Sequence, residues 1–349
     1  MLDPAVRDRI LKSLNHEEGD RVPVWDFLDN RAIVDHIAPD EPDYQRAMAK
    51  VYHTLGIDLC RGWGASFRET DDQAEGAGDA RISGRTWWKV VRPIRSLEDL
   101  KSYQPQPVSE EWLNGEWLDF NRRMIELLEP YTMFVPGAGC GFHATYDLMG
   151  QELFSYAIYD APADVERILE VQAHNHLEMA RAVAKAGLGP IYFIGDDIAC
   201  KGALMFSPEF LRRTFIPALR RCCEAVKSAG MKVVFHSDGY VMEILDDMLD
   251  AGIDGLNPIE PLAGMDIGLL KRRYAKRLVL VGNVDCSQVL PLGTVEDVVE
   301  ATKECIRQAS PGGGHFIGSS SEIVPCTPVE NILAFYDACH RYGTYPISI

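Results

Sequence analysis

The sequence predicts one (β/α)8 barrel spanning residues 1–349. Its length lies in the range over which such barrels form a single closed core. Short β-branched or aromatic runs bounded by Gly, Pro or Asp alternate with longer segments of helical period, as in βαβ units with a parallel sheet. There are eight such runs, at residues 22–27, 56–60, 132–137, 190–197, 232–238, 255–261, 278–285 and 315–320.

Capping signals mark the helices between the later runs. Ser207 as N-cap and Pro208 at the first helical position predict a helix that ends at Gly230. Thr294 and Asp297 form a capping-box-like pair at the start of the next clear helix. A final helix is expected from residue 327 onward.

The first part of the chain follows the repeat less regularly. Residues 1–25 predict an amphipathic helical extension that leads into the first strand. Residues 84–94 have apolar residues at strand spacing and no preceding crossover helix, which predicts a small β-hairpin or extended excursion over one end of the barrel. With no internal repeat and no low-complexity linker, the sequence favours a single domain.

Composition narrows the class of protein. A hydrophobic content of 46% with 25% charged residues is typical of a soluble globular chain. The nine cysteines show no paired CxxC spacing, which argues against a disulfide framework or a structural zinc cluster. We find no signal-peptide pattern and no apolar run of membrane-spanning length, so we expect a cytoplasmic protein that does not enter a membrane. A net charge of -17 argues against nucleic acid as a partner.

Polar residues end nearly every predicted strand. Each could be an ordinary turn or capping residue, but in barrel enzymes the active site lies where the carboxyl ends of the strands meet. Together they predict a site at that end. The residues are Asp26, Asp58, Cys140 or His143, Asp196 and Asp197, His236 and Asp238, Asn257 and Glu260, Asn283 and Asp285, and Ser319 to Glu322.

His236 and Asp238 are the centre of the predicted site. Residues two apart on a strand point to the same face, so the imidazole and the carboxylate converge at the barrel mouth. The pair fits a zinc site with an open position, and it fits equally a metal-free general acid or base oriented by a carboxylate. A structural histidine is the third interpretation. His143 is an outside candidate in a glycine-rich loop that lacks a phosphate-binding pattern.

Five motifs resemble the uroporphyrinogen decarboxylase superfamily, and the likeness extends over almost the whole chain. They are RVPVWDF, GDDIACKGALMFSPEFLRRTFIPALR, VVFHSDG, LVLVGNVD and GGGHFIGSSSEIVPCTPVENI. The resemblance implies a (β/α)8 barrel. Decarboxylases of this superfamily carry an Arg-rich stretch after the first strand that holds the carboxylates of uroporphyrinogen. Here the stretch is WDFLDNRAIVDHI, with Arg31 alone, so we do not expect that activity.

The other branch of the superfamily comprises zinc-dependent corrinoid methyltransferases. In its thiol-methylating members, the zinc ligands resemble a His-x-Cys-Gly motif followed later in the chain by a second Cys. This chain keeps His236 and Gly239, but Asp238 and Ser321 stand at the two Cys positions. The resemblance therefore implies a zinc site with oxygen ligands: His236, Asp238, Ser321 and Glu322 or Glu260. Such a site suits the O-demethylase type, in which the metal polarises the ether oxygen of a methoxylated aromatic.

In this interpretation Asp196 and Asp197 act beside the metal pair. The substrate-binding residues are Asn257, Glu260, Asn283, His143, Trp25 and Phe27, although Trp25 and Phe27 could equally pack the barrel floor. The cobalamin (corrinoid) would be carried by a separate partner protein docked over the mouth, because the chain has no DxHxxG motif. The alternatives are a metal-free decarboxylase or lyase acting on a smaller acid, and a non-catalytic barrel that binds a small molecule or the corrinoid protein.

Overall fold

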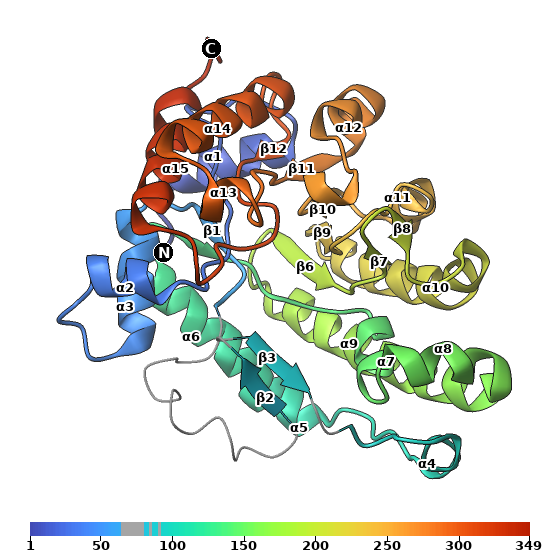
Figure 1. Cartoon of the computed structure of the whole chain (residues 1–349). Coiled ribbons are helices and arrows are strands. Elements are labelled where there is room, and N and C mark those ends of the chain that lie inside the picture. Colours follow the sequence, from blue (N-terminus) through green and yellow to red (C-terminus); the bar gives the residue numbers. More distant parts are fainter. Residues whose placement is uncertain (64–79, 84–85, 90–91) are drawn as a thin grey trace.

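A closed ring of parallel strands surrounded by helices forms the centre of the computed structural model, which describes residues 1–63, 80–83, 86–89 and 92–349 (Figure 1). Six strands pair in the order β12-β11-β10-β9-β6-β5, and β1 pairs in parallel with β4. β5 follows β4 closely in the chain, so one predicted strand joins both sheets. The bridges Trp25–Leu59 and Val24–Ile317 close the ring. The predicted barrel is confirmed.

The barrel strands are short. They are β1 (Leu59–Cys60), β4 (Met133–Phe134), β5 (Gly137–Ala138), β6 (Ile191–Gly195), β9 (Lys232–His236), β10 (Gly255–Asn257), β11 (Val279–Val281) and β12 (His315–Phe316). The first predicted run, residues 22–27, contributes isolated bridges in place of a continuous strand. Pro23 has no N–H for a ladder hydrogen bond, which explains the interruption.

Helices cover the outside of the ring, and the predicted caps are present. Ser207 Oγ accepts from the N–H of Phe210 at 3.2 Å, and Thr294 with Asp297 forms a full capping box. The helices are α1 (Pro4–Leu14), α2 (Arg31–Ile37), α3 (Tyr44–Thr54), α4 (Leu97–Ser102), α5 (Glu110–Trp112), α6 (Leu118–Leu128), α7 (Phe142–Asp147), α8 (Gln151–Asp160), α9 (Pro162–Ala186), α10 (Pro208–Lys227), α11 (Leu245–Ala251), α12 (Ile267–Tyr274), α13 (Val289–Leu292), α14 (Val295–Ala309) and α15 (Val329–Tyr342).

Helix α1 covers the amino-terminal end of the barrel. Its apolar residues, among them Ile10, pack into the cluster that fills the ring interior. Its Arg9 forms a buried ion pair with Asp58 at 2.5 Å, and Asp58 also accepts from Arg21. The sequence prediction for Asp58 is therefore wrong: Asp58 precedes β1 and lies at the end opposite the predicted site. The residue that follows β1 at the site end is Arg61.

Outside the ring, β2 (Ala80–Ser83) and β3 (Thr86–Lys89) pair antiparallel. This pairing falls partly within the excursion expected at residues 84–94. Residues 84–85 and 90–91 of that excursion lie outside the described residues.

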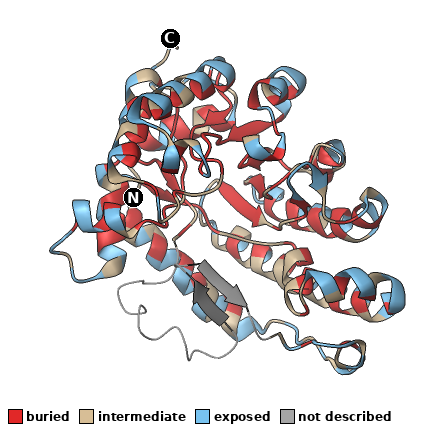
Figure 2. Ribbon diagram, in the orientation of Figure 1, coloured by how far each residue is buried: buried red, intermediate tan, exposed pale blue. Residues whose placement is uncertain are grey.

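Burial follows the layers of the barrel (Figure 2). Most residues of the barrel strands are buried, and most of the helices around them are buried on the side that faces the strands. One apolar cluster lies between strands and helices, and a second lies inside the ring. Within the described ranges, no helix combines the length and apolar character that crossing a membrane requires.

Candidate metal centre

Three side chains converge at the carboxyl end of the barrel: Asp197, His236 and Asp238. One ligand atom from each lies within 4.8 Å of the others. His236 ends β9, and its Nε2 is 3.8 Å from Asp197 Oδ1 and 3.9 Å from Asp238 Oδ1. The structure thus brings together the predicted pair and adds Asp197, which follows the neighbouring strand β6.

The orientation of His236 is set by Asn257. Nδ1 of the imidazole lies 2.6 Å from Oδ1 of Asn257, and the two residues are register partners on β9 and β10. An amide oxygen only accepts, so Nδ1 carries the proton. Nε2 is then left with its lone pair directed toward the two carboxylates, as a metal ligand requires.

The donor set fits a divalent cation. Asp238 is about half exposed, yet its Oδ1 atom is buried and has no hydrogen-bond partner within the described residues. An unpartnered buried carboxylate oxygen needs compensation. Two carboxylates with one neutral imidazole form a nitrogen and oxygen set that Zn²⁺ accepts, with room for further ligands.

Asp196 has a different role from its neighbour. It is buried, and its two oxygens accept the backbone N–H groups of Cys140 and His143. Asp196 therefore holds the loop that enters α7. That loop brings His143 to Asp197, with Nδ1 to Oδ2 at 3.6 Å. This contact places His143 beside the triad. The His143 ring also stacks on the ring of Tyr146.

Two further carboxyl groups surround the triad. Glu260 Oε2 accepts the N–H of Gly239 at 3.0 Å, which ties it to the loop after β9. Burial raises the pKa of Glu322; Arg61 opposes that shift, and Asp238 adds to it. Neither glutamate belongs to the close triad, so their roles as ligands stay predictions, as does that of Ser321.

Trp25 and Asp26 are not among the three residues of the triad. Trp25 is buried in the ring interior, where its centroid is 6.1 Å from that of Phe193 and 5.7 Å from that of Phe316. Asp26 is buried against Ser319 and Tyr336, and burial raises its pKa to about 6. Trp25 therefore packs against rings from other strands, and Asp26 is hydrogen-bonded to residues near the other end of the chain.

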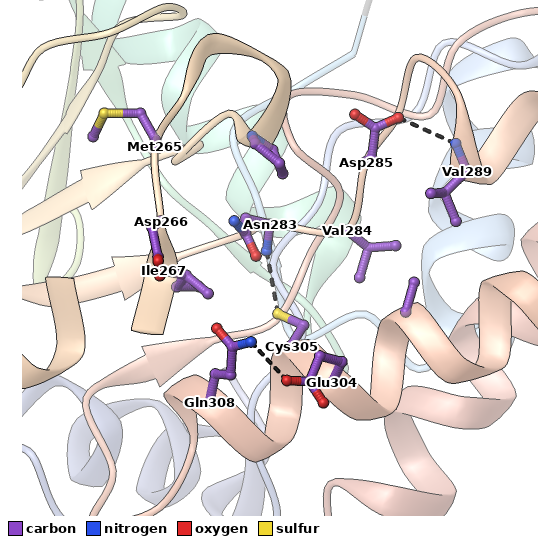
Figure 3. Close-up of a pocket in the computed structure, with 12 residues that line it drawn as sticks. Met265, Asp266, Ile267, Asn283, Val284, Asp285, Val289, Glu304, Cys305 and Gln308 are labelled. Carbon is purple, nitrogen blue, oxygen red and sulfur yellow. Dashed lines mark hydrogen bonds between the residues drawn. The ribbon is translucent and has the colours of Figure 1, made fainter. Parts of the chain in front are cut away.

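Asn283 lines a different pocket, of about 380 Å³, between α12 and α14 (Figure 3). Its side-chain amide donates to the carbonyl of Ile259 at 2.9 Å, and its backbone N–H donates to Cys305. Asp285 lines the same pocket and caps α13 through Val289 N–H. The structure does not bring Asn283 to the triad.

Arg61 is the residue at this mouth that sequence reasoning missed. Its guanidinium carbon lies 4.4 Å from the Phe27 ring centroid and 5.2 Å from that of Phe193. The signal was present, because Arg61 directly follows the second predicted strand. The assignment of Asp58 to the strand end concealed it.

The fold and the triad define a class: (β/α)8-barrel proteins with a candidate divalent-metal centre at the carboxyl ends of the strands. The family model described as Uroporphyrinogen decarboxylase (URO-D) matches residues 82–342. The chain belongs to this family.

Relatives within the family carry two kinds of name. The chain is 28% identical over 177 residues to the methylcobamide:CoM methyltransferase MtaA of Methanosarcina barkeri, covering 51% of this chain and 49% of the relative. The match thus spans about half the length of that protein. It is 23% identical over 369 residues to the uroporphyrinogen decarboxylase of Coxiella burnetii, covering 96% and 95%. The fold matches a methyltransferase from Methanosarcina mazei with a TM-score of 0.74 and 23% identity, covering 97% of this chain and 98% of that one.

Proposed function

We propose that this chain is a metal-dependent methyltransferase that moves a methyl group from a methoxylated aromatic to the cobalt of a corrinoid carried by a separate protein. The observation that carries the proposal is the convergence of Asp197, His236 and Asp238 at the barrel mouth, with Asp238 Oδ1 buried and unpartnered within the described residues. The corrinoid methyltransferases among the relatives support it, and the wider activity rests on analogy with them.

The ligand set favours an ether donor over a thiol substrate. Thiolate ligands suit zinc sites that activate thiols, and the triad has none. A bound metal would act as a Lewis acid that polarises the ether oxygen. The methyl–oxygen bond then breaks with its electron pair retained by the oxygen as a phenolate. Co(I) of the partner's corrinoid supplies the electron pair for the new bond to the methyl carbon.

The chain's own residues prepare that step. Asn257 holds the proton on Nδ1 of His236 and so keeps Nε2 available. Asp196 holds the loop that places His143 beside Asp197. Burial raises the pKa of Glu322, which favours its acid form, so we assign Glu322 as the candidate proton donor to the departing phenolate.

Methyl transfer to free cob(I)alamin tests the proposal. The purified chain is loaded with Zn²⁺ and incubated with 2-methoxyphenol, and methylcobalamin is followed by its absorbance. We expect turnover by the wild type and by Asp250→Asn, an exposed aspartate on α11 that serves as control. Asp238→Asn should lose most of the rate.

Two results would favour a different function. Methylation of 2-mercaptoethanesulfonate from methylcobalamin, with no reaction of the ether, would assign the reaction named for the relatives. Release of CO2 from uroporphyrinogen or a smaller acid without added metal would assign the decarboxylase alternative.

A further inference from the structure

Arg61 lies over two aromatic rings at the same mouth as the triad. It follows β1, whereas Phe27 is the last residue of the first strand run and Phe193 lies in β6. The guanidinium lies over both rings, at 4.4 Å and 5.2 Å from their centroids. Such contacts occupy the faces of the cation and leave its edge, with the planar N–H donors, free for a ligand.

The charge of Arg61 has no direct partner in the part of the chain that the structure describes. Within the described ranges, no carboxylate or other acceptor makes a hydrogen bond or an ion pair with its guanidinium. Glu322 is close enough for Arg61 to lower its pKa, but the two do not form an ion pair. A half-buried cation with unused donors in a site is a strong candidate for binding an anion.

We propose that Arg61, together with Phe27 and Phe193, forms a carboxylate-binding subsite that selects aromatic acids carrying a methoxy group. The proposal rests on the proposed function and names its substrate class. The edge of the guanidinium receives the carboxylate in bidentate geometry, and the two phenylalanine rings fix the plane of that edge.

Phe193 contacts both the cation and the triad. Its ring centroid is 5.2 Å from the Arg61 guanidinium carbon and 5.5 Å from the His236 ring centroid. The cation and the imidazole of the triad therefore share one aromatic neighbour. A methoxybenzoate carries its carboxylate and its ether oxygen on the same ring, so a molecule lying along Phe193 can reach both ends of the site.

Charge sets the direction in which such a ligand binds. In the metal-loaded site, Zn²⁺ would balance the two negative charges of Asp197 and Asp238, so the triad end has no excess positive charge. Arg61 has its positive charge uncompensated among the described residues, so the carboxylate is attracted there. The neutral ether oxygen is thereby left at the triad.

Equilibrium binding without any turnover tests the subsite. Benzoate, 4-methoxybenzoate, methoxybenzene and 2-mercaptoethanesulfonate are titrated into the Zn²⁺-loaded wild type by calorimetry. The same titrations are run on Arg61→Met, Arg61→Lys and the control Arg213→Met. Arg213 also lies over a phenylalanine ring, Phe210 at 5.5 Å, but on the outer helix α10. Thermal unfolding checks that each variant is folded.

We expect both benzoates to bind the wild type and Arg213→Met more tightly than methoxybenzene does. Arg61→Met should weaken the benzoates about tenfold to a hundredfold, the range of a hydrogen bond to a charged group, and leave methoxybenzene unchanged. Arg61→Lys should retain part of the benzoate affinity that Arg61→Met loses, because the lysine ammonium keeps the positive charge but lacks the planar pair of N–H donors. Equal benzoate affinity in wild type and Arg61→Met overturns the subsite. Binding of the sulfonate alone, lost in Arg61→Met, overturns its assignment to aromatic acids.

The two proposals can fail separately. If benzoate binding depends on Arg61 but no methoxybenzoate transfers its methyl to cob(I)alamin, the subsite stands and the methyltransferase function fails. If methyl transfer occurs equally from methoxybenzene and 4-methoxybenzoate and is unaffected in Arg61→Met, the function stands and the subsite fails.

Discussion

His236 and Asn257 are paired across neighbouring strands, with Nδ1 of the imidazole 2.6 Å from Oδ1 of the amide. The contact joins residues that a sequence places far apart and fixes which ring nitrogen faces Asp197 and Asp238. The chemistry of the candidate site depends on this orientation.

Replacing Asn257 by Leu should weaken metal binding without removing any of the triad. Loss of the outer partner of a ligating histidine typically costs about tenfold to a hundredfold in metal affinity. Competition with a chromophoric chelator measures the change. Asn114→Ala, at an exposed position, is the control and should bind metal as the wild type does. An unchanged affinity in Asn257→Leu would mean that the imidazole is not a ligand or needs no orienting.

Asp196 and Asp197 are adjacent, and their substitutions should have opposite effects. Asp196→Asn places an amide group against the N–H donors of Cys140 and His143, so the free energy of unfolding should fall by about 1–3 kcal/mol. Asp197→Asn should lower metal affinity. It should leave the stability of the metal-free protein unchanged or raise it, since it removes repulsion from Asp238. Denaturant unfolding and chelator competition on both variants measure this, and a reversed pattern would refute the assigned roles.

His315 should make the protein sensitive to acid. Burial lowers its pKa to about 3 from an ordinary 6.5. Between these values the unfolded chain binds a proton that the native chain does not, so stability is complete above pH 6.5 and falls as the pH decreases toward 3. The contribution is on the order of 5 kcal/mol. In His315→Gln we expect lower stability at neutral pH and a flatter dependence over this range, measured by unfolding in denaturant. An equally steep dependence would show that other groups account for it.

Asp58 should matter for stability and not for the site. It is buried and paired with Arg9 and Arg21 at the end of the barrel opposite the triad. Asp58→Asn takes the carboxylate from Arg21, while Arg9 keeps its ion pair with Asp20, so unfolding free energy should fall by about 1–3 kcal/mol, while metal affinity is unchanged. Asp119→Asn, on the exposed face of α6, is the control for unfolding. A metal affinity that falls with Asp58→Asn would place Asp58 in the functional site.

The sequence was sufficient for the barrel and for the meeting of His236 with Asp238, because both follow from short-range patterns in the chain. Strand alternation predicted that His236 and Asp238 share a face, and Nε2 of His236 is 3.9 Å from Oδ1 of Asp238, although β9 ends at His236 and Asp238 lies in the loop beyond it. The errors came from positions set by pairing between strands. Asp58 and Arg61 are three residues apart, and only the bounds of β1, which pairs with β4, show that Asp58 precedes the strand and Arg61 follows it at the site end.

The same limit applies to Asn283 and Asp196. Both follow strands and both looked like site residues, but their hydrogen bonds go to Ile259 and to the Cys140 loop. Such partners come from neighbouring units of the barrel, so no local pattern reveals them. Asp197 was expected to act beside the metal, and its place in the triad depends on the pairing of β6 with β9.

Metal content is the most direct measurement of the central claim. The protein is purified without chelator, dialysed against Zn²⁺ and then against buffer, and analysed by elemental mass spectrometry alongside His236→Ala and Asp238→Asn. We predict about one zinc ion per wild-type chain, a loss of most of that metal in both variants, and retained folding by circular dichroism. Wild-type protein that holds no stoichiometric metal, or variants that hold as much as the wild type, would contradict a metal centre formed by Asp197, His236 and Asp238.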